Sequence, residues 1–245
     1  MSGYEWTSSQ LNVLEVLTGG DIEVLGRLPF SSNRVFLVRV MRGEYEVNAV
    51  YKPQKGERPL WDFPAGTLAA REVAAYIVAE AAGWLFVPPT VMRTDAPLGS
   101  GSLQLFIDHD PDQHYFVMMH KRRDEMKKFA AFDVVINNAD RKAGHIFEGP
   151  EGRLWGVDHG LSFNVEPKLR TVIWAFGGEL IPAAVRDALQ QLQSALASGS
   201  DVADRLADLI AAEELLETRA RLEFLLTDGR FPEPSGPFHM PWPLI

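Results

Sequence analysis

The sequence has 245 residues, contains no cysteine and carries a formal net charge of −9. The lack of cysteine excludes disulfides, thiolate metal sites and cysteine nucleophiles, and the negative charge disfavours general binding to nucleic acid. The sequence has no unbroken run of about 18 apolar residues, so a membrane span is not expected. The N-terminal residues do not resemble a secretory signal. We therefore expect a cytoplasmic protein without stable membrane insertion.

The first part of the chain is predicted to consist mostly of strands. Short runs of β-branched and large apolar residues predict strands at 21–28, 35–40, 45–51, 90–93 and 103–107. Between the first two strands, residues 26–33 carry proline, serine and asparagine, which favour a turn. A helix is expected to begin near Thr67, which can act as its N-cap, and to end at Gly83.

The second part of the chain is predicted to be mostly helical. The polar segment 108–114 is the expected boundary, a helix follows at about 122–136, and residues 182–226 have strong helical patterning. We therefore expect an α+β fold with a strand-rich N-lobe (1–108), a mostly helical C-lobe (109–245) and a cleft between the lobes.

Two aspartates stand on either side of a predicted hairpin in the second part. Asp140, in NNADRKAGH, follows a predicted helix, and Asp158, in GVDHG, follows a short apolar strand. Because the intervening segment has the length of a hairpin, both carboxylates can lie at the same end of the hairpin. His145 can serve as an additional metal ligand. Carboxylate oxygens suit Mg²⁺ or Mn²⁺ held against a polyphosphate. The spacing therefore predicts a metal–nucleotide site.

A lysine and a glutamate in the first part fit the same chemistry. Phosphoryl transfer requires cations on the phosphate oxygens, an aligned nucleophile and a lysine on the phosphates that are not transferred. Lys52 closes the predicted strand at 45–51, where alternation can aim it at the cleft, and Glu72 lies on the following helix as its natural partner. The turn at 28–33 can cover phosphates with backbone N–H groups.

This set of residues resembles the protein-kinase-like superfamily, and within it the phosphatidylinositol 3-/4-kinase branch and its bacterial relatives. DRKAGH is similar to the D-R-x-x-x-N catalytic loop of that branch, and GVDHG is similar to its D-F-G segment. Over about residues 20–225 the chain resembles an actinobacterial family of small phosphatidylinositol 3-/4-kinase-like proteins. The resemblance implies a two-lobed protein-kinase-like fold that binds ATP together with Mg²⁺ or Mn²⁺.

The resemblance also implies roles for individual residues. Asp140 matches the catalytic aspartate that orients or deprotonates the acceptor hydroxyl, and Asp158 matches the metal-binding aspartate. Lys52 matches the strand lysine that contacts the nucleotide phosphates, with Glu72 as its helix partner. His145 stands where the family has a metal-binding asparagine, and because imidazole favours softer ions than Mg²⁺, Mn²⁺ dependence is expected.

Nucleotide contacts are implied in two further segments. The stretch with Gln104, Phe106 and Ile107 is similar to the hinge that hydrogen-bonds adenine through its backbone. The phosphate-covering loop has Ser31 and Ser32, in PFSSN, in place of the usual glycines, as in the lipid-kinase branch. A further departure is His159, which replaces the phenylalanine of D-F-G.

The function expected from these features is transfer of phosphate to a hydroxyl acceptor. A protein Ser/Thr or a small molecule is favoured over an inositol lipid, because a chain of net charge −9 has little to hold it at an anionic bilayer. Two alternatives stay open: a degenerate kinase-like module that only binds nucleotide or a partner protein, and transfer of AMP by the same fold. A metal-dependent hydrolase that uses Asp140, His145 and Asp158 leaves Lys52 and Glu72 without roles.

Overall fold

A five-stranded antiparallel sheet forms the first part of the computed structural model, which describes residues 5–28, 33–236 and 238–245, with side chains described from residue 12 onward. The strand order is β1-β2-β3-β5-β4. The strands are β1 (Asp21–Arg27), β2 (Phe36–Arg42), β3 (Tyr45–Pro53), β4 (Thr90–Arg93) and β5 (Gly101–Leu105). Each predicted strand is therefore present, with ends shifted by at most two residues. Between β2 and β3, Gly43 has a φ of 63°, the left-handed conformation that a two-residue hairpin requires.

One helix precedes the sheet and was missed by the strand-rich prediction. Helix α1 (Glu5–Gly19) packs on the sheet, and its Val16 and Leu17 are buried against Val38, Val40 and Tyr51. Val13, Val16 and Leu17 repeat at the i, i+3, i+4 spacing of a helix face. Among the side chains that the structure describes, this apolar face lies in the second half of the helix.

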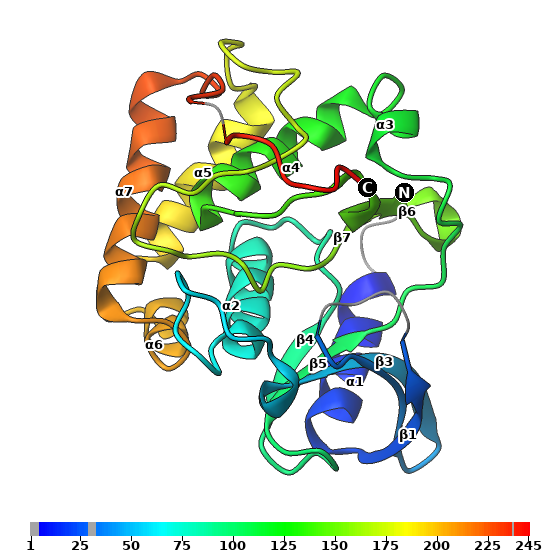
Figure 1. Cartoon of the computed structure of the whole chain (residues 1–245). Coiled ribbons are helices and arrows are strands. Elements are labelled where there is room, and N and C mark those ends of the chain that lie inside the picture. The colour runs from blue at the N-terminus through cyan, green and yellow to red at the C-terminus, as the bar shows by residue number, and fades with distance from the viewer. Residues whose placement is uncertain (1–4, 29–32, 237) are drawn as a thin grey trace.

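Helix α2 (Leu68–Ala81) links the sheet to the rest of the molecule. It contacts β4 and β5 on one side and the helices of the second part on the other, as Figure 1 shows in cyan. Being covered on several sides, it is buried over most of its length, including the charged residues Arg71 and Glu72. Gly83 follows it with a φ of 69°, consistent with the predicted end of the helix.

The second part is mainly helical. Its helices are α3 (Tyr115–Met118), α4 (Arg123–Ile136), α5 (Ala183–Ala195), α6 (Asp201–Ala207) and α7 (Ala212–Asp228). A hairpin of β6 (Ile146–Glu148) and β7 (Leu154–Gly156) lies between α4 and α5 in the sequence. Short 3-10 turns occur at η1 (Gln54–Gly56), η2 (Ala143–His145) and η3 (Pro150–Gly152). This arrangement confirms the predicted two-lobed α+β fold.

One large hydrophobic core holds the helical part together and extends to α2. Phe129 and Phe132 of α4 pack against Phe86, and the same core includes Leu189 of α5 and Leu222 of α7. The last segment of the chain crosses this part as an extended strap, seen in red in Figure 1. Among the helices in the described residues, none has the length and apolar character that crossing a membrane requires.

Candidate active site

Three predicted site residues from separate elements meet in one cluster. Lys52 lies on β3, Glu72 on α2 and Asp158 two residues after the end of β7. The Nζ of Lys52 is 2.5 Å from Oε1 of Glu72 and 2.5 Å from Oδ1 of Asp158. A single ammonium therefore joins a buried carboxylate of the first part to a half-exposed carboxylate of the second.

The charges in this cluster stabilise one another. Burial lowers the pKa of Lys52, but the carboxylates of Asp158 and Glu72 outweigh burial and raise this pKa above its ordinary value. The nearby Lys52 ammonium, in turn, holds the pKa of Asp158 well below its usual range. At neutral pH the cluster consequently presents an ammonium and an ionised Asp158, the charge states that a metal–polyphosphate ligand needs.

The backbone around Asp158 is fixed by α2. Oε2 of Glu72 accepts a hydrogen bond from the N–H of His159 at 2.9 Å. Asp158 itself has a φ of 58°, an uncommon conformation for a residue other than glycine. Glu72 therefore orients both Lys52 and the residue that follows Asp158.

Asp140 lies on the loop after α4, as predicted. Its N–H donates to Oδ1 of Asn138 at 3.0 Å, and its Oδ2 is 3.4 Å from Nζ of Lys142. Partial burial raises the pKa of Asp140, and the negative charge of Asp158 adds to the rise, while Lys142 and Arg170 oppose it. Asp140 and Asp158 thus interact electrostatically, although they occupy different loops.

A buried ion pair anchors the Asp140 loop. The side chains of Arg141 and Asp133 are fully buried, and Nη2 of Arg141 lies 2.8 Å from Oδ1 of Asp133. Arg141 also donates to the carbonyl of Val157 at 3.0 Å, just before Asp158. Asn138 and Thr171 donate to the same aspartate at 3.0 and 3.1 Å. Asp133 was missed by sequence reasoning, and its only signal is a carboxylate among the apolar residues of AAFDVVI.

Replacing Asp133 with alanine is expected to destabilise the fold by about 3–5 kcal/mol, because Arg141 would remain buried without a counter-charge. Urea unfolding followed by circular dichroism measures the change in the free energy of unfolding. Asp187→Ala, at an exposed position of α5, is the control and should stay within about 0.5 kcal/mol of wild type. Equal effects of the two substitutions would contradict an anchoring role for Asp133.

The predicted metal ligands His145 and Asp158 are neighbours. Nε2 of His145 is 3.4 Å from Oδ2 of Asp158, and two adjacent ligands of an octahedral ion with bonds of about 2.1 Å lie about 3 Å apart. Burial lowers the pKa of His145 to about 4, so the ring is neutral at pH 7 and a nitrogen lone pair is available. The N–H of Lys142 lies 3.4 Å from Nδ1, too far to fix the tautomer firmly.

His145 and Asp158 can bind a divalent ion only if ligands other than protein side chains complete its coordination. Within the part of the chain that the structure describes, no three His, Asp or Glu side chains form a group that could hold a metal by itself. Mg²⁺ commonly takes one or two protein ligands and completes its shell with waters and substrate phosphates. The donor set therefore fits an ion that enters together with a nucleotide.

The residues predicted to bind the nucleotide base differ in whether their backbone groups are already hydrogen-bonded within the protein. The backbone of Gln104 is paired with both β3 and β4, and its buried side chain donates to Thr90 at 2.9 Å. Phe106 donates its N–H to the carbonyl of Asn48 at 2.9 Å. The N–H of Ile107 makes no backbone hydrogen bond within the described residues, so it is the donor in this stretch that suits a base. Ser31 and Ser32 lie outside the described residues.

The comparison with known families agrees with this geometry. A family model described as phosphatidylinositol 3- and 4-kinase matches residues 66–202, more than half of the chain. The chain belongs to the phosphatidylinositol 3- and 4-kinase family. The match begins just before α2 and includes Glu72, Asp140, His145 and Asp158.

Two curated relatives are similar in sequence. Protein Rv2133c of Mycobacterium tuberculosis is 41% identical over 263 residues, covering 93% of this chain and 94% of the relative. Phosphatidylinositol 4-kinase gamma 4 of Oryza sativa subsp. japonica is 34% identical over 113 residues, covering 39% of this chain and 20% of the relative. The likeness to the rice kinase is therefore confined to a fifth of that protein.

Solved kinases share the fold at low sequence identity. The Golgi casein kinase with Mn/ADP bound has a TM-score of 0.55 at 13% identity, covering 90% of this chain and 75% of that chain. The Helicobacter pylori proinflammatory kinase CtkA has a TM-score of 0.55 at 10% identity, covering 88% and 94%. These likenesses show that this member of the phosphatidylinositol 3- and 4-kinase family has a kinase-like fold.

Proposed function

We propose that the protein is an ATP- and divalent-metal-dependent phosphotransferase that moves the γ-phosphoryl group to a hydroxyl acceptor. The observation that carries this proposal is the contact of Lys52 with both Glu72 and Asp158, at 2.5 Å each, in a chain of a kinase family. A purely structural scaffold has no need of an ammonium shared between two carboxylates at the meeting point of two lobes.

The proposed division of labour follows the geometry. The residues 1–108 form the lobe that covers the nucleotide, with Ile107 facing the base, and residues 109–245 carry the catalytic and metal-binding loops. Lys52 holds the phosphates that stay on the nucleotide, and Glu72 keeps its ammonium in place. Asp158 and His145 would hold Mg²⁺ or Mn²⁺, which neutralises charge on the phosphate oxygens when bound.

Asp140 is proposed to act on the acceptor. Its partly buried carboxylate accepts the proton of the acceptor hydroxyl while the hydroxyl oxygen forms its bond to phosphorus and the bond to the ADP oxygen breaks. Lys142, 3.4 Å from the same carboxylate, keeps Asp140 ionised against the effect of burial. The roles of Asp140 and Asp158 are therefore distinct: one handles the acceptor and the other the nucleotide.

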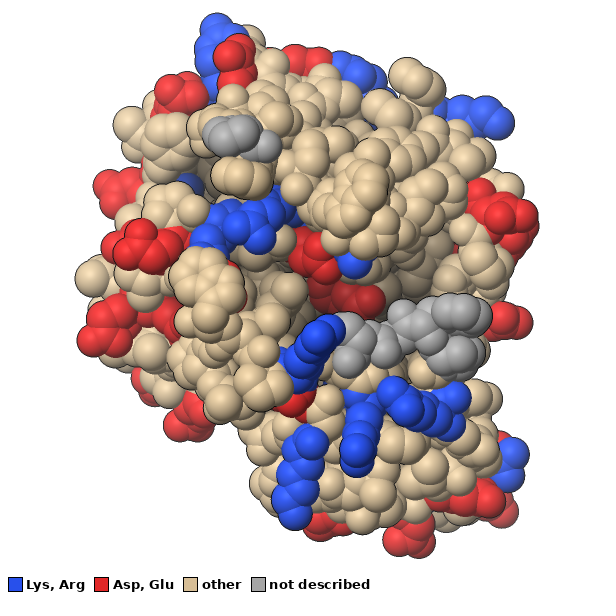
Figure 2. All heavy atoms as spheres, in the orientation of Figure 1, with Lys and Arg blue, Asp and Glu red and all other residues tan. Residues whose placement is uncertain are grey.

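The acceptor is proposed to be a protein hydroxyl or a small molecule. Figure 2 shows acidic atoms in the hollow between the upper and lower parts, with Lys and Arg atoms on both sides of it. The Lys and Arg atoms beside the hollow attract an anionic nucleotide. The net charge of −9, by contrast, gives the molecule as a whole little attraction to an anionic bilayer. The Mycobacterium tuberculosis relative supports a family of small actinobacterial members, to which we propose this chain belongs.

The proposal is tested with γ-labelled and, separately, α-labelled ATP in the presence of Mg²⁺ or Mn²⁺. Label from the γ position is expected in the protein itself or in dephosphorylated casein as a generic acceptor. Lys52→Ala is expected to lower the rate of phosphoryl transfer by about 10²–10³-fold, the usual loss when one group that stabilises charge in the transition state is removed. Lys55→Ala, at an exposed position three residues along, is the matched control and should behave as wild type.

Other outcomes would redirect the proposal. Transfer of the α label would show nucleotidyl transfer by the same residues. Binding of ATP without any turnover would indicate a degenerate kinase-like module, and failure to bind ATP at all would overturn the nucleotide site.

A further inference from the structure

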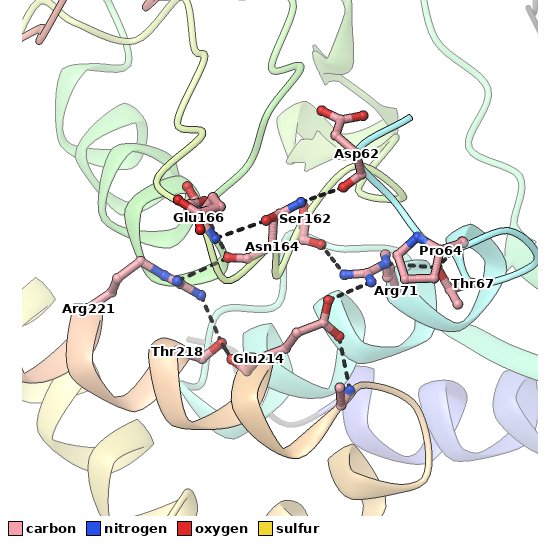
Figure 3. A network of polar contacts seen from close by, with 12 residues as sticks. Asp62, Pro64, Thr67, Arg71, Ser162, Asn164, Glu166, Glu214, Thr218 and Arg221 are labelled. Carbon is pink, nitrogen blue, oxygen red and sulfur yellow. Dashed lines mark hydrogen bonds and ion pairs between the residues drawn. The ribbon is translucent and has the colours of Figure 1, made fainter. Parts of the chain in front are cut away.

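Arg71, the neighbour of Glu72 on α2, is a buried arginine with three defined partners. It is 1% exposed, and Figure 3 shows its guanidinium between the segment after Asp158 and helix α7. Nη1 donates to the carbonyl of Ser162 at 2.6 Å, and Nη2 donates to Oε1 of Glu214 at 2.6 Å. Nε donates to Oγ1 of Thr67 at 3.1 Å, one turn earlier on the chain. The guanidinium is thus satisfied on three sides.

The partner of Arg71 on α7 is itself held in place. Oε2 of Glu214 accepts the N–H of Ala211 at 3.0 Å, so the carboxylate caps the start of α7 while it binds Arg71. One turn further on, Thr218 accepts from Nη2 of Arg221 at 3.0 Å, and Arg221 reaches the carbonyl of Asn164 at 3.4 Å. Helix α7 therefore contacts the segment after Asp158 at two points, one of them through Arg71.

Two consecutive residues of α2 hold the same short segment. Glu72 accepts the N–H of His159, and Arg71 donates to the carbonyl of Ser162. Consecutive side chains on a helix point about 100° apart, so the two contacts fix both the position and the rotation of α2 against this segment. In this orientation Glu72 also reaches Nζ of Lys52, at 2.5 Å.

We infer that Arg71, braced by Glu214, is a positioning residue that holds α2 in the orientation in which Glu72 binds Lys52 and orders the backbone after Asp158. A buried ion pair is a poor way to add stability, because a well-packed apolar pair often serves as well or better. An arginine instead fixes the relative orientation of its partners, since its planar guanidinium donates to a carbonyl and a carboxylate at fixed angles. This inference rests on the proposed function, because it concerns residues of the proposed site.

A double-mutant cycle tests the coupling. The variants are Arg71→Lys, Glu72→Gln and the double variant, and the quantity is kcat/KM for transfer of the γ label. We expect Arg71→Lys to lower kcat by about tenfold with little change in the KM for ATP, and the double variant to deviate from additivity by about fivefold or more. Additive effects would overturn the positioning role. Glu214→Gln, which retains the shape of the partner, is expected to give a weaker loss of the same kind.

Arg93 offers a matched control for the loss of a buried arginine. It is 6% exposed, donates to the carbonyls of Leu17 and Gly20 and pairs with Asp95, but it does not contact the segment after Asp158. Arg93→Lys is therefore expected to lower stability while its effect on kcat simply adds to that of Glu72→Gln. Coupling as large as that of Arg71→Lys would show that any buried arginine in this region has the same effect.

A measurement that does not depend on activity separates this inference from the proposed function. The N–H of His159 is held by Glu72, so its hydrogen exchange reports the position of α2. Arg71→Lys is expected to speed its exchange about tenfold relative to amides of the α4 core, whereas Arg93→Lys should leave that ratio unchanged. An unchanged ratio in Arg71→Lys would overturn the inference even if transfer is observed. If Arg71→Lys speeds the exchange of the His159 amide but the protein transfers no phosphate, the positioning role of Arg71 is supported and the proposed function is wrong.

Discussion

Replacing Asp158 with alanine is expected to reduce metal-dependent phosphoryl transfer by roughly 10³-fold or more, since a bound divalent ion contributes several kcal/mol to the stability of the transition state. Asp158 is the carboxylate that meets both Lys52 and His145, at 2.5 and 3.4 Å. Its removal takes away a proposed metal ligand and the counter-charge of Lys52 together. The rate of transfer from γ-labelled ATP, measured across a range of Mg²⁺ and Mn²⁺ concentrations, gives the size of the loss.

Two comparisons make the Asp158 result specific. Asp158→Ala should remain folded with a modest loss of stability, because it removes a counter-charge of Lys52 and places alanine at a φ of 58°. Asp187→Ala, exposed on α5, should transfer phosphate at the wild-type rate. Retention of full activity in Asp158→Ala, or recovery of activity simply by adding more metal, would contradict its assignment as an essential ligand.

Replacing Asp140 with asparagine is expected to lower transfer to a hydroxyl acceptor by about 10²–10⁴-fold, the usual contribution of a positioned general base. Asparagine keeps the size of the side chain and removes its ability to take a proton. The affinity for ATP and metal, measured by calorimetry, should stay within a few-fold of wild type. A parallel loss of nucleotide binding would show instead that Asp140 belongs to the metal site.

The same assignment predicts a pH dependence. Burial raises the pKa of Asp140 above its ordinary value of 3.8. Only the ionised carboxylate can accept a proton, so kcat should rise with pH as Asp140 ionises and fall as the pH drops through this raised pKa. In Asp140→Asn the residual rate should lack this acidic limb, and persistence of the limb would assign it to another group.

Local signals in the sequence accounted for the strands and for the cluster of Lys52, Glu72 and Asp158. Strand ends are set by the alternation and turn residues of a few neighbouring positions, which can be read without the fold. Lys52 lies near the end of β3 and Asp158 lies just beyond β7, so both could be placed from the pattern of their strands, and Glu72, inside α2, was expected as the partner of Lys52 on the following helix. The missed helix α1 shows the limit, since the part of its apolar face that the structure describes consists of Val13, Val16 and Leu17.

The contacts that orient the site were not predictable in the same way. Arg71 and Glu214 are 143 positions apart, and Arg141 meets Asp133 only after α4 and the loop have folded back. Apart from the apolar neighbours of Asp133 in AAFDVVI, nothing in the composition around these residues distinguishes them from solvated charges. Their role depends on burial, and burial of a charged residue is decided by the tertiary fold.

His159 illustrates a departure that the structure explains. The sequence places histidine where the related motif has phenylalanine, and the ring is fully buried, 5.4 Å from Phe132 in an edge-on arrangement. Burial lowers the pKa of His159 well below its usual value, so the ring is neutral and packs much as a phenyl ring would. The substitution is therefore compatible with burial of the ring against Phe132.

We propose that Lys52, Glu72 and Asp158 form a nucleotide–metal site. Crystals grown with Mn²⁺ and a non-hydrolysable ATP analogue test it most directly through the anomalous signal of manganese. We expect a manganese peak within about 2.5 Å of the Asp158 carboxylate and the Lys52 ammonium on a phosphate of the analogue. A nucleotide bound elsewhere, or manganese that does not contact Asp158, would contradict it.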